Sequence, residues 1–283
     1  MFKMFTRKKA DPREELRDLL GDYEVPTMPA TAIKLLGLLR DPDVPMAEVA
    51  SGVEMDPGLT VRVLQLINSA AFGLLSEVSN LQHAVSLLGR SRLESLVLAF
   101  AAADRIPATM DCMKARQFWG AAARRATLAR VLAQHMHAAT QAEAFTAGLL
   151  QDIAVPLLAS KNPDRYADLL ERWHAEPDAQ LDDLEREYFG HDHATVGALM
   201  AEDWGLPEYL VTAIGGHHMG NGERIVEPAV SLVSLLKYHP ESDGRQAVAT
   251  RAEGDFGIDA ELINEMMDRS FSDAEQVASM FCN

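Results

Sequence analysis

Apolar side chains recur at the spacing of an α-helix along almost the whole chain, and this pattern limits the fold more than any other feature. The clearest stretch has apolar residues at i, i+4, i+7, i+8 and i+11, namely Leu59, Val63, Leu66, Ile67 and Ala70. Such a stripe predicts a helix with one buried face. We find no convincing pair of alternating runs joined by a two-residue turn, which would indicate a β-hairpin. The sequence therefore predicts an all-α fold.

Capping residues mark where several of these helices begin and end. Asp56 and Pro57 precede the stripe and fit the N-cap and the first helical turn. Asn80 predicts another helix start, and Gly89 can supply a left-handed stop before the next helix opens. Near the C-terminus, Ser272 fits the first position of a capping box and predicts a further helix start.

The helical pattern breaks at Ile106–Lys114, which predicts a division into two lobes. We expect a flexible basic tip at residues 1–12, an N-terminal helical lobe at 13–106 and a C-terminal helical lobe at 107–283. The sequence leaves open whether the two lobes share one continuous core.

Charge and composition exclude several classes of partner. Forty-two acidic residues against 26 Lys and Arg give a formal net charge of −16, which disfavours binding to nucleic acid or anionic lipid. The longest purely apolar run, Leu96–Ala103, is far shorter than the roughly 20 residues of a membrane span. The two cysteines, Cys112 and Cys282, form no CxxC motif. We therefore expect a cytoplasmic protein with no nucleic-acid or membrane partner.

Histidines are the first candidates for chemistry. Of nine, His191, His193, His217 and His218 gather around one predicted helix, and Asp152 lies on a separate segment. Imidazoles and a carboxylate from several helices can form a metal site in a helical bundle. The chain has no HExxH or ExxH motif, and histidines at helix ends often serve only as hydrogen-bonding groups. The spacing alone leaves both interpretations open.

Short motifs in a fixed order cover about residues 20–240. They include Val25-Pro-Thr-Met-Pro29, Asp41-Pro-Asp-Val44, Met55-Asp-Pro-Gly-Leu59, Leu66-Ile-Asn-Ser-Ala-Ala-Phe-Gly73, Ala147-Gly-Leu-Leu150, Tyr188-Phe-Gly190, His193-Ala-Thr-Val-Gly197, Trp204-Gly-Leu-Pro207 and His217-His218. Together they resemble the HDOD domain, which is similar to the HD and HD-GYP metal-dependent phosphohydrolases. The resemblance implies an N-terminal helical lobe packed on an HD-like helical lobe. It also implies an output or regulatory module of bacterial signalling that lacks hydrolase activity.

The chain departs from the HD pattern at positions that would bind metal. The first metal histidine would fall near Ala121, and the His-Asp doublet is replaced by Gln151 and Asp152. The late aspartate would fall within Ser231–Leu236, which contains no acidic residue. Matching residues remain at Asp152, His193, His217 and His218. We therefore expect no catalytic residue and no cofactor; if a metal is present, it would be Fe, Mn or Zn on the vestigial cluster of Gln151, Asp152, His193, His217 and His218.

These observations predict a non-catalytic regulatory protein that acts through protein partners. Two alternatives remain: a divergent phosphohydrolase acting on a nucleotide or cyclic dinucleotide, and a sensor that binds a nucleotide without cleaving it. The arginines that could contribute to such a binding pocket are Arg90, Arg92, Arg124 and Arg125.

Three residues in the most recognisable motif are candidates for interaction or for locking the lobes together, namely Asn68, Ser69 and Phe72. A simpler interpretation is that Asn68 ends its helix by bonding to the backbone that follows. The pathway, the partner and the oligomeric state are not determined by the sequence.

Overall fold

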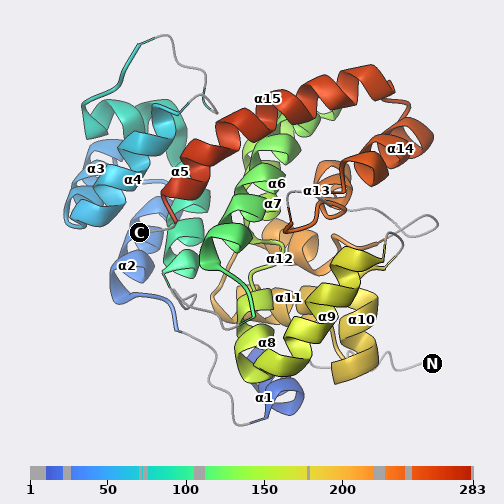
Figure 1. The fold of residues 1–283 in the computed structure, drawn as a ribbon. Helices are drawn as coiled ribbons and strands as arrows, with labels where there is room; N and C mark the ends of the chain where they lie inside the picture. Colours follow the sequence, from blue (N-terminus) through green and yellow to red (C-terminus); the bar gives the residue numbers. More distant parts are fainter. Residues whose placement is uncertain are drawn as a thin grey trace, which may run out of the picture.

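The computed structural model describes residues 11–21, 27–69, 72, 76–104, 112–176, 179–219, 227–239 and 244–281. Within these ranges the regular elements are helices, which confirms the all-α fold. Figure 1 shows the arrangement. The helices are α1 (Pro12–Leu20), α2 (Ala30–Arg40), α3 (Met46–Glu54), α4 (Pro57–Ile67), α5 (Leu81–Ala103), α6 (Ala115–Met136), η2 (Ala138–Thr140), α7 (Gln141–Leu150), α8 (Val155–Lys161), α9 (Pro163–Ala175), α10 (Leu181–Phe189), α11 (His193–Asp203), α12 (Glu208–Gly215), α13 (Pro228–Val233), α14 (Arg245–Phe256) and α15 (Ala260–Ser279).

Two of the predicted helix starts form as expected, because a side chain satisfies a free backbone amide at each. Asp56 accepts a hydrogen bond from the amide of Leu59 at 3.0 Å, and Asn80 accepts one from His83 at 3.0 Å. Gly89 adopts a left-handed φ of 71°, but the chain resumes its helix directly afterwards. Gly89 therefore interrupts α5 at a kink between two helical segments, at the point where the sequence predicts one helix to stop and the next to open.

The predicted helix start at Ser272 is wrong. Helix α15 runs without interruption from Ala260 to Ser279, and its N-cap is Asp259, which accepts a hydrogen bond from the amide of Glu261 at 2.8 Å.

Helices α2–α5 pack together as the N-terminal lobe, while α1 lies against α11 of the C-terminal lobe. The ammonium group of Lys161 donates a hydrogen bond to the backbone oxygen of Leu20, which holds the end of α1 in that place. The predicted N-terminal lobe thus contains a helix that packs elsewhere. The predicted tip lies outside the described residues apart from 11 and 12, and so does most of the predicted break at Ile106–Lys114.

The C-terminal lobe is organised around α6, which packs against α7, α13 and α15. One continuous apolar core joins both lobes and answers the question that the sequence left open. Phe281, just beyond α15, stacks on Trp119 of α6 with ring centroids 4.8 Å apart and on Phe100 of α5 at 5.1 Å. The C-terminal helix therefore ties the two lobes together.

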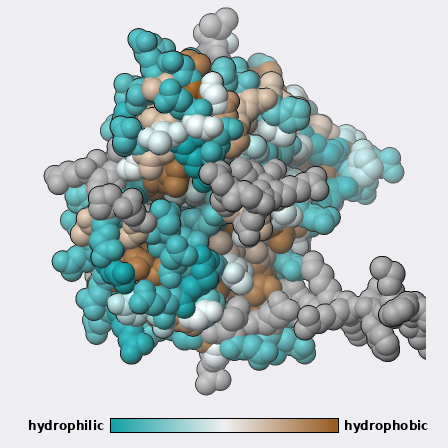
Figure 2. All heavy atoms as spheres, turned by 90° about the vertical axis from the view of Figure 1, so that its right-hand side faces the viewer, coloured by the Kyte–Doolittle hydropathy of each residue, from teal (hydrophilic) through white to brown (hydrophobic). Residues whose placement is uncertain are grey.

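Polar contacts also cross between the lobes. Arg40 at the end of α2 donates to the backbone oxygen of Gly205 in the C-terminal lobe at 2.7 Å, and it also pairs with Glu94 of α5 within its own lobe at 2.7 Å. The hydroxyl groups of Ser95 and Tyr209 lie 3.1 Å apart. On the face shown in Figure 2, hydrophilic residues predominate and interrupt the apolar patches, as the acidic composition leads one to expect.

Among the described residues, one helical stretch, Ala138–Lys161, is long and apolar enough by length and composition to cross a membrane. Of its most apolar 18-residue window, 89% is buried inside the protein, and the stretch contains α7 and α8 of the core. Its apolar character is accounted for by packing.

Candidate functional site

The histidines and the aspartate of the predicted cluster come together where several helix ends meet. Asp152 lies in the turn after α7, His193 is the first residue of α11, and His217 and His218 follow the end of α12. Asp152, His193 and His217 are no more than 3% exposed. The site is therefore an internal polar cluster within the C-terminal lobe.

A cationic side chain and a hydroxyl group hold the Asp152 carboxylate. Arg125 of α6 donates from Nη1 to Oδ2 at 2.5 Å, and the Tyr238 hydroxyl donates to the same oxygen at 2.5 Å. Arg125 also donates to the backbone oxygen of Leu236 and lies over the Tyr238 ring, 5.0 Å from its centroid. Burial would raise the pKa of Asp152, but the positive charge of Arg125 and the nearby imidazoles hold it well below its usual range.

Three imidazoles converge beside this pair through their Nε2 atoms. His193 Nε2 lies 3.1 Å from His217 Nε2 and 2.9 Å from His218 Nε2. The remaining Asp152 oxygen, Oδ1, lies 3.5 Å from the Nε2 atoms of both His193 and His217. The four side chains thus surround one small polar volume.

The Nδ1 atoms of the same imidazoles point to acceptors. His193 Nδ1 lies 2.6 Å from Glu185 Oε2, and His217 Nδ1 lies 2.6 Å from the backbone oxygen of Ile214. A carbonyl oxygen only accepts, so Nδ1 of His217 carries its proton and its Nε2 presents a lone pair. Lone pairs that face one another at these distances require a positive charge between them, either a proton or a metal ion.

Glu185 of α10 is the anchor of the cluster. This carboxylate is fully buried, and it accepts hydrogen bonds from the backbone amide of His193 at 2.7 Å and from the Tyr166 hydroxyl group. Nearby, Arg186 donates to Asp182 at 2.7 Å and also to Asp192, the N-cap of α11. The start of α11, and with it the imidazole of His193, is therefore fixed by charged residues of α10.

The three imidazoles differ in their affinity for a proton. Burial would lower the pKa of His193, but the carboxylate of Glu185, with Asp152 and Asp182 nearby, raises it to about 9. Burial lowers the pKa of His217 and of His218 well below the usual value, and the neighbouring imidazoles lower both further. A protonated His193 can donate its one Nε2 hydrogen to either of its two neutral neighbours, so in the absence of metal a single proton stabilises the cluster.

Comparison with known proteins identifies the chain at this point. The model of the HDOD domain matches residues 25–219, well over half of the sequence. The chain belongs to the HDOD family. An uncharacterized protein of Treponema pallidum is 26% identical over 214 residues, which cover 75% of this chain and 41% of the relative. The chain thus spans less than half the length of this curated relative.

Solved structures share the HDOD fold. A candidate phosphohydrolase from Shewanella amazonensis superposes with a TM-score of 0.73 at 22% identity, over 96% of this chain and 98% of its own. An HDOD domain protein from Geobacter sulfurreducens gives 0.69 at 22% identity, over 95% of each chain. A candidate signal transduction protein from Marinobacter aquaeolei gives 0.69 at 21% identity, over 96% of this chain and 65% of its own.

The histidine cluster offers ligands for one metal ion but not for a second. His193, His217 and His218 offer ligand atoms within 4.8 Å of one another, and their outward hydrogen bonds match the second coordination shell that usually orients metal-binding histidines. If an ion is bound there, it would supply Lewis acidity and lower the pKa of a bound water. A second ion would need donors at Ala121 and Gln151, where an apolar side chain and a neutral amide stand.

Gln151 shows how far this position departs from a metal ligand. Its side chain is buried, its Nε2 lies 3.5 Å from Asp152 Oδ1, and its Oε1 has no hydrogen-bond partner in the described structure. Ala121 is fully buried on α6, and Arg125, one turn further along the same helix, reaches Asp152 in its place.

The structure brings together the five predicted residues of the cluster, whereas the predicted basic pocket does not form as a unit. Arg90 donates to the backbone oxygens of Leu38 and Asp41, and Arg124 to that of Lys237. The roles of four residues were not predicted from the sequence, namely Arg125 on Asp152, Tyr238 on Asp152, Glu185 on His193 and Tyr166 on Glu185. The acidic residues at i and i+3 on α10 were the available signal for Glu185.

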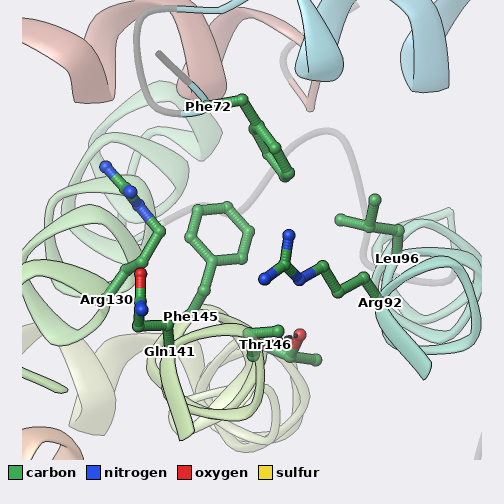
Figure 3. A pocket seen from close by; sticks show the side chains of 8 residues that line it. Phe72, Arg92, Leu96, Arg130, Gln141, Phe145 and Thr146 are labelled. Atoms are coloured by element: carbon green, nitrogen blue, oxygen red, sulfur yellow. Dashed lines mark hydrogen bonds between the residues drawn. The ribbon is translucent and has the colours of Figure 1, made fainter. Parts of the chain in front are cut away.

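Two of the three candidate interaction residues have local roles. The Asn68 side chain donates to the backbone oxygen of Val78 at 2.8 Å and accepts from its amide at 2.7 Å, and Ser69 donates to Leu66 at 2.7 Å. These bonds fix the end of α4, as the simpler interpretation predicts. Phe72 instead lines a cavity between the lobes, shown in Figure 3.

Proposed function

We propose that this HDOD chain is a non-catalytic regulatory protein of the bacterial cytoplasm that acts through contacts with protein partners. The observation that carries the proposal is the ion pair between the guanidinium group of Arg125 and the carboxylate of Asp152. In a metal-dependent hydrolase a carboxylate at this point would bind metal, whereas here Oδ2 of Asp152 is bound by Arg125 and Tyr238.

Burial and charge support this reading. The side chains of Arg125 and Asp152 are 2% and 4% exposed, so opening the pair would leave a buried charge without a partner. A proton on His193 accounts for the convergence of the three imidazoles without a metal ion. The fold shared with a candidate signal transduction protein from Marinobacter aquaeolei agrees with a role in signalling.

Metal analysis of the protein, purified without a polyhistidine tag, tests the proposal. We expect far less than one Fe, Mn or Zn ion per chain, even after incubation with each metal and removal of the excess. A stoichiometric ion that disappears in both His217→Ala and His218→Ala would contradict the interpretation that these residues act only as hydrogen-bonding groups.

A metal-dependent phosphohydrolase is a second candidate function, favoured by the geometry of the three Nε2 atoms. Their separations of 2.9 and 3.1 Å are close to the spacing of nitrogen ligands around one tetrahedral ion. The fold shared with a candidate phosphohydrolase from Shewanella amazonensis points the same way. Hydrolysis of a cyclic dinucleotide in the presence of Mn²⁺, abolished by His217→Ala, would favour this function over the first.

Affinity capture from the native bacterium tests the proposed mode of action. The full chain should retain a partner in constant proportion across independent preparations, and mass spectrometry would identify it. Failure to retain any partner under mild cross-linking would count against action through protein contacts.

A further inference from the structure

The junction of the two lobes contains a cavity of about 120 Å³ that is unrelated to the histidine cluster. Its walls come from α5 of the N-terminal lobe and from α6 and α7 of the C-terminal lobe, together with Phe72. A second hollow of about 390 Å³ adjoins it and shares Arg92 and Gln141. The two together are as large as sites that take small molecules, which typically measure about 300–1,000 Å³.

Two arginines give this cavity a positive charge in a strongly acidic protein. Figure 3 shows the guanidinium of Arg92 reaching toward the rings of Phe72 and Phe145, with Arg130 beyond Phe145. Among the described residues, no carboxylate forms an ion pair with either Arg92 or Arg130.

Arg130 is held in conditions that favour an anion nearby. Its Nε atom is buried without a hydrogen-bond partner in the described structure. Burial lowers its pKa; Asp273 opposes this shift, while the like charges of Arg269 and Arg92 add to it. Arginine remains charged under these conditions, so an anionic ligand would relieve both the repulsion and the unsatisfied donor.

The remaining walls suit a flat apolar ring. Phe72 and Phe145 present aromatic rings, and Leu96 closes the side toward α5. Thr146 donates its hydroxyl proton to the backbone oxygen of Ala142 at 3.0 Å, so its oxygen can still accept a hydrogen bond from a ligand. Aromatic side chains are common stacking partners of nucleic-acid bases, whatever the base.

We propose that this interlobe cavity binds a nucleoside phosphate, with the base against Phe72 and Phe145 and the phosphate on Arg92 and Arg130. A doubly charged phosphate suits two guanidinium groups better than a singly charged carboxylate ligand would. The adjoining hollow lies at the kink after Gly89 in α5 and at the start of α7. Glu143 on its wall excludes anions from that side and directs the phosphate toward the arginines.

A ligand in this position would touch both lobes. This inference does not depend on whether the histidine cluster binds a metal ion. Helix α5 packs directly on α7 at this junction. Binding would therefore stabilise one relative placement of the lobes and offers a route by which a small molecule could control a protein surface elsewhere.

Calorimetry and thermal shift on the full chain test the proposal, with AMP, GMP, CMP and UMP as probes. We expect at least one to bind, and Arg92→Ala to weaken that binding by about tenfold or more, the loss typical of a charge-assisted contact. Arg130→Ala should weaken it similarly. Arg165→Ala, an exposed arginine of α9, is the matched control and should leave binding unchanged. Because Arg92 is exposed, its replacement should not alter folding in the absence of ligand.

Controls with parts of the ligand separate the two halves of the inference. Adenosine and inorganic phosphate should each bind more weakly than the best monophosphate. Inorganic phosphate binding as tightly as any monophosphate would overturn the site for a base. Absence of binding by all four probes, or binding that survives Arg92→Ala, would overturn the proposal as a whole.

Discussion

Replacing Arg125 with methionine should destabilise the protein strongly while keeping a side chain of similar length. The change leaves the Asp152 carboxylate buried without its cation, since the Asp152 side chain is only 4% exposed. Breaking a buried ion pair by removing one partner typically costs about 3–5 kcal/mol. In a chain of 283 residues, that loss corresponds to a fall in the thermal midpoint of about 5–8 °C.

The double variant Arg125→Met/Asp152→Asn separates charge from packing. It removes both charges together, so we expect it to recover about 2 kcal/mol or more relative to the sum of the single variants. Differential scanning calorimetry on all four proteins gives this coupling energy directly. Arg172→Met, which breaks an exposed pair with Glu176 at 3.1 Å, is the control and should leave the midpoint almost unchanged. Additive effects of the two buried changes would refute the reasoning.

Two further predictions concern the proton on His193 and the packing of α6 on α7. The pKa of His193 is raised from 6.5 to about 9, so protonated His193 stabilises the folded state. In metal-free protein this contribution to the free energy of unfolding should be complete below pH 6.5. Up to about 3 kcal/mol of it should be lost as the pH rises to about 9. Thermal midpoints across this range should show the loss, and Glu185→Gln, which removes the main cause, should show much less of it; identical pH profiles would contradict the assignment. Gly148→Ala should cost about 1–3 kcal/mol in the free energy of unfolding, because its new Cβ would lie 3.0 Å from the backbone oxygen of Arg125. Urea titrations measure this loss. Gly120→Ala, whose Cβ meets nothing within 4 Å, is the control and should be neutral or stabilising in the same experiment. Equal effects of the two substitutions would refute the packing argument.

Local signals predicted the fold well where a single residue decides the structure. Asp56 and Asn80 cap helices as predicted because each needs only an amide three residues away. Ser272 misled because a capping motif is weaker than a continuous apolar stripe. Buried residues continue through this stretch of α15, including Met267 before Ser272 and Ala274 after it, and their packing keeps the backbone helical.

The candidate site was predictable only as far as its motifs extend. The ordered resemblance placed Asp152, His193, His217 and His218 together, and the structure does so. The ion pair of Arg125 with Asp152 could not be read from spacing, because it depends on how closely α6 approaches α7. That approach is set by three-dimensional packing and not by the sequence neighbours of the residues involved.

The outward hydrogen bonds of the imidazoles were equally inaccessible to sequence analysis. Whether Nε2 or Nδ1 faces the cluster depends on acceptors that lie elsewhere in the fold, such as Glu185 on α10 and the backbone oxygen of Ile214 on α12. The loss of ligands at Ala121 and Gln151 led us to expect no resident metal, whereas the observed geometry still fits one ion. Whether an ion binds stays a prediction.

Hydrolysis of a simple phosphodiester by untagged protein supplied with Mn²⁺ is the most direct test of a lost catalytic centre. If the ion pair of Arg125 with Asp152 stands where a metal would act, the rate should equal that of the buffer and of His217→Ala. Sustained Mn²⁺-dependent release of product that His217→Ala abolishes would contradict that claim.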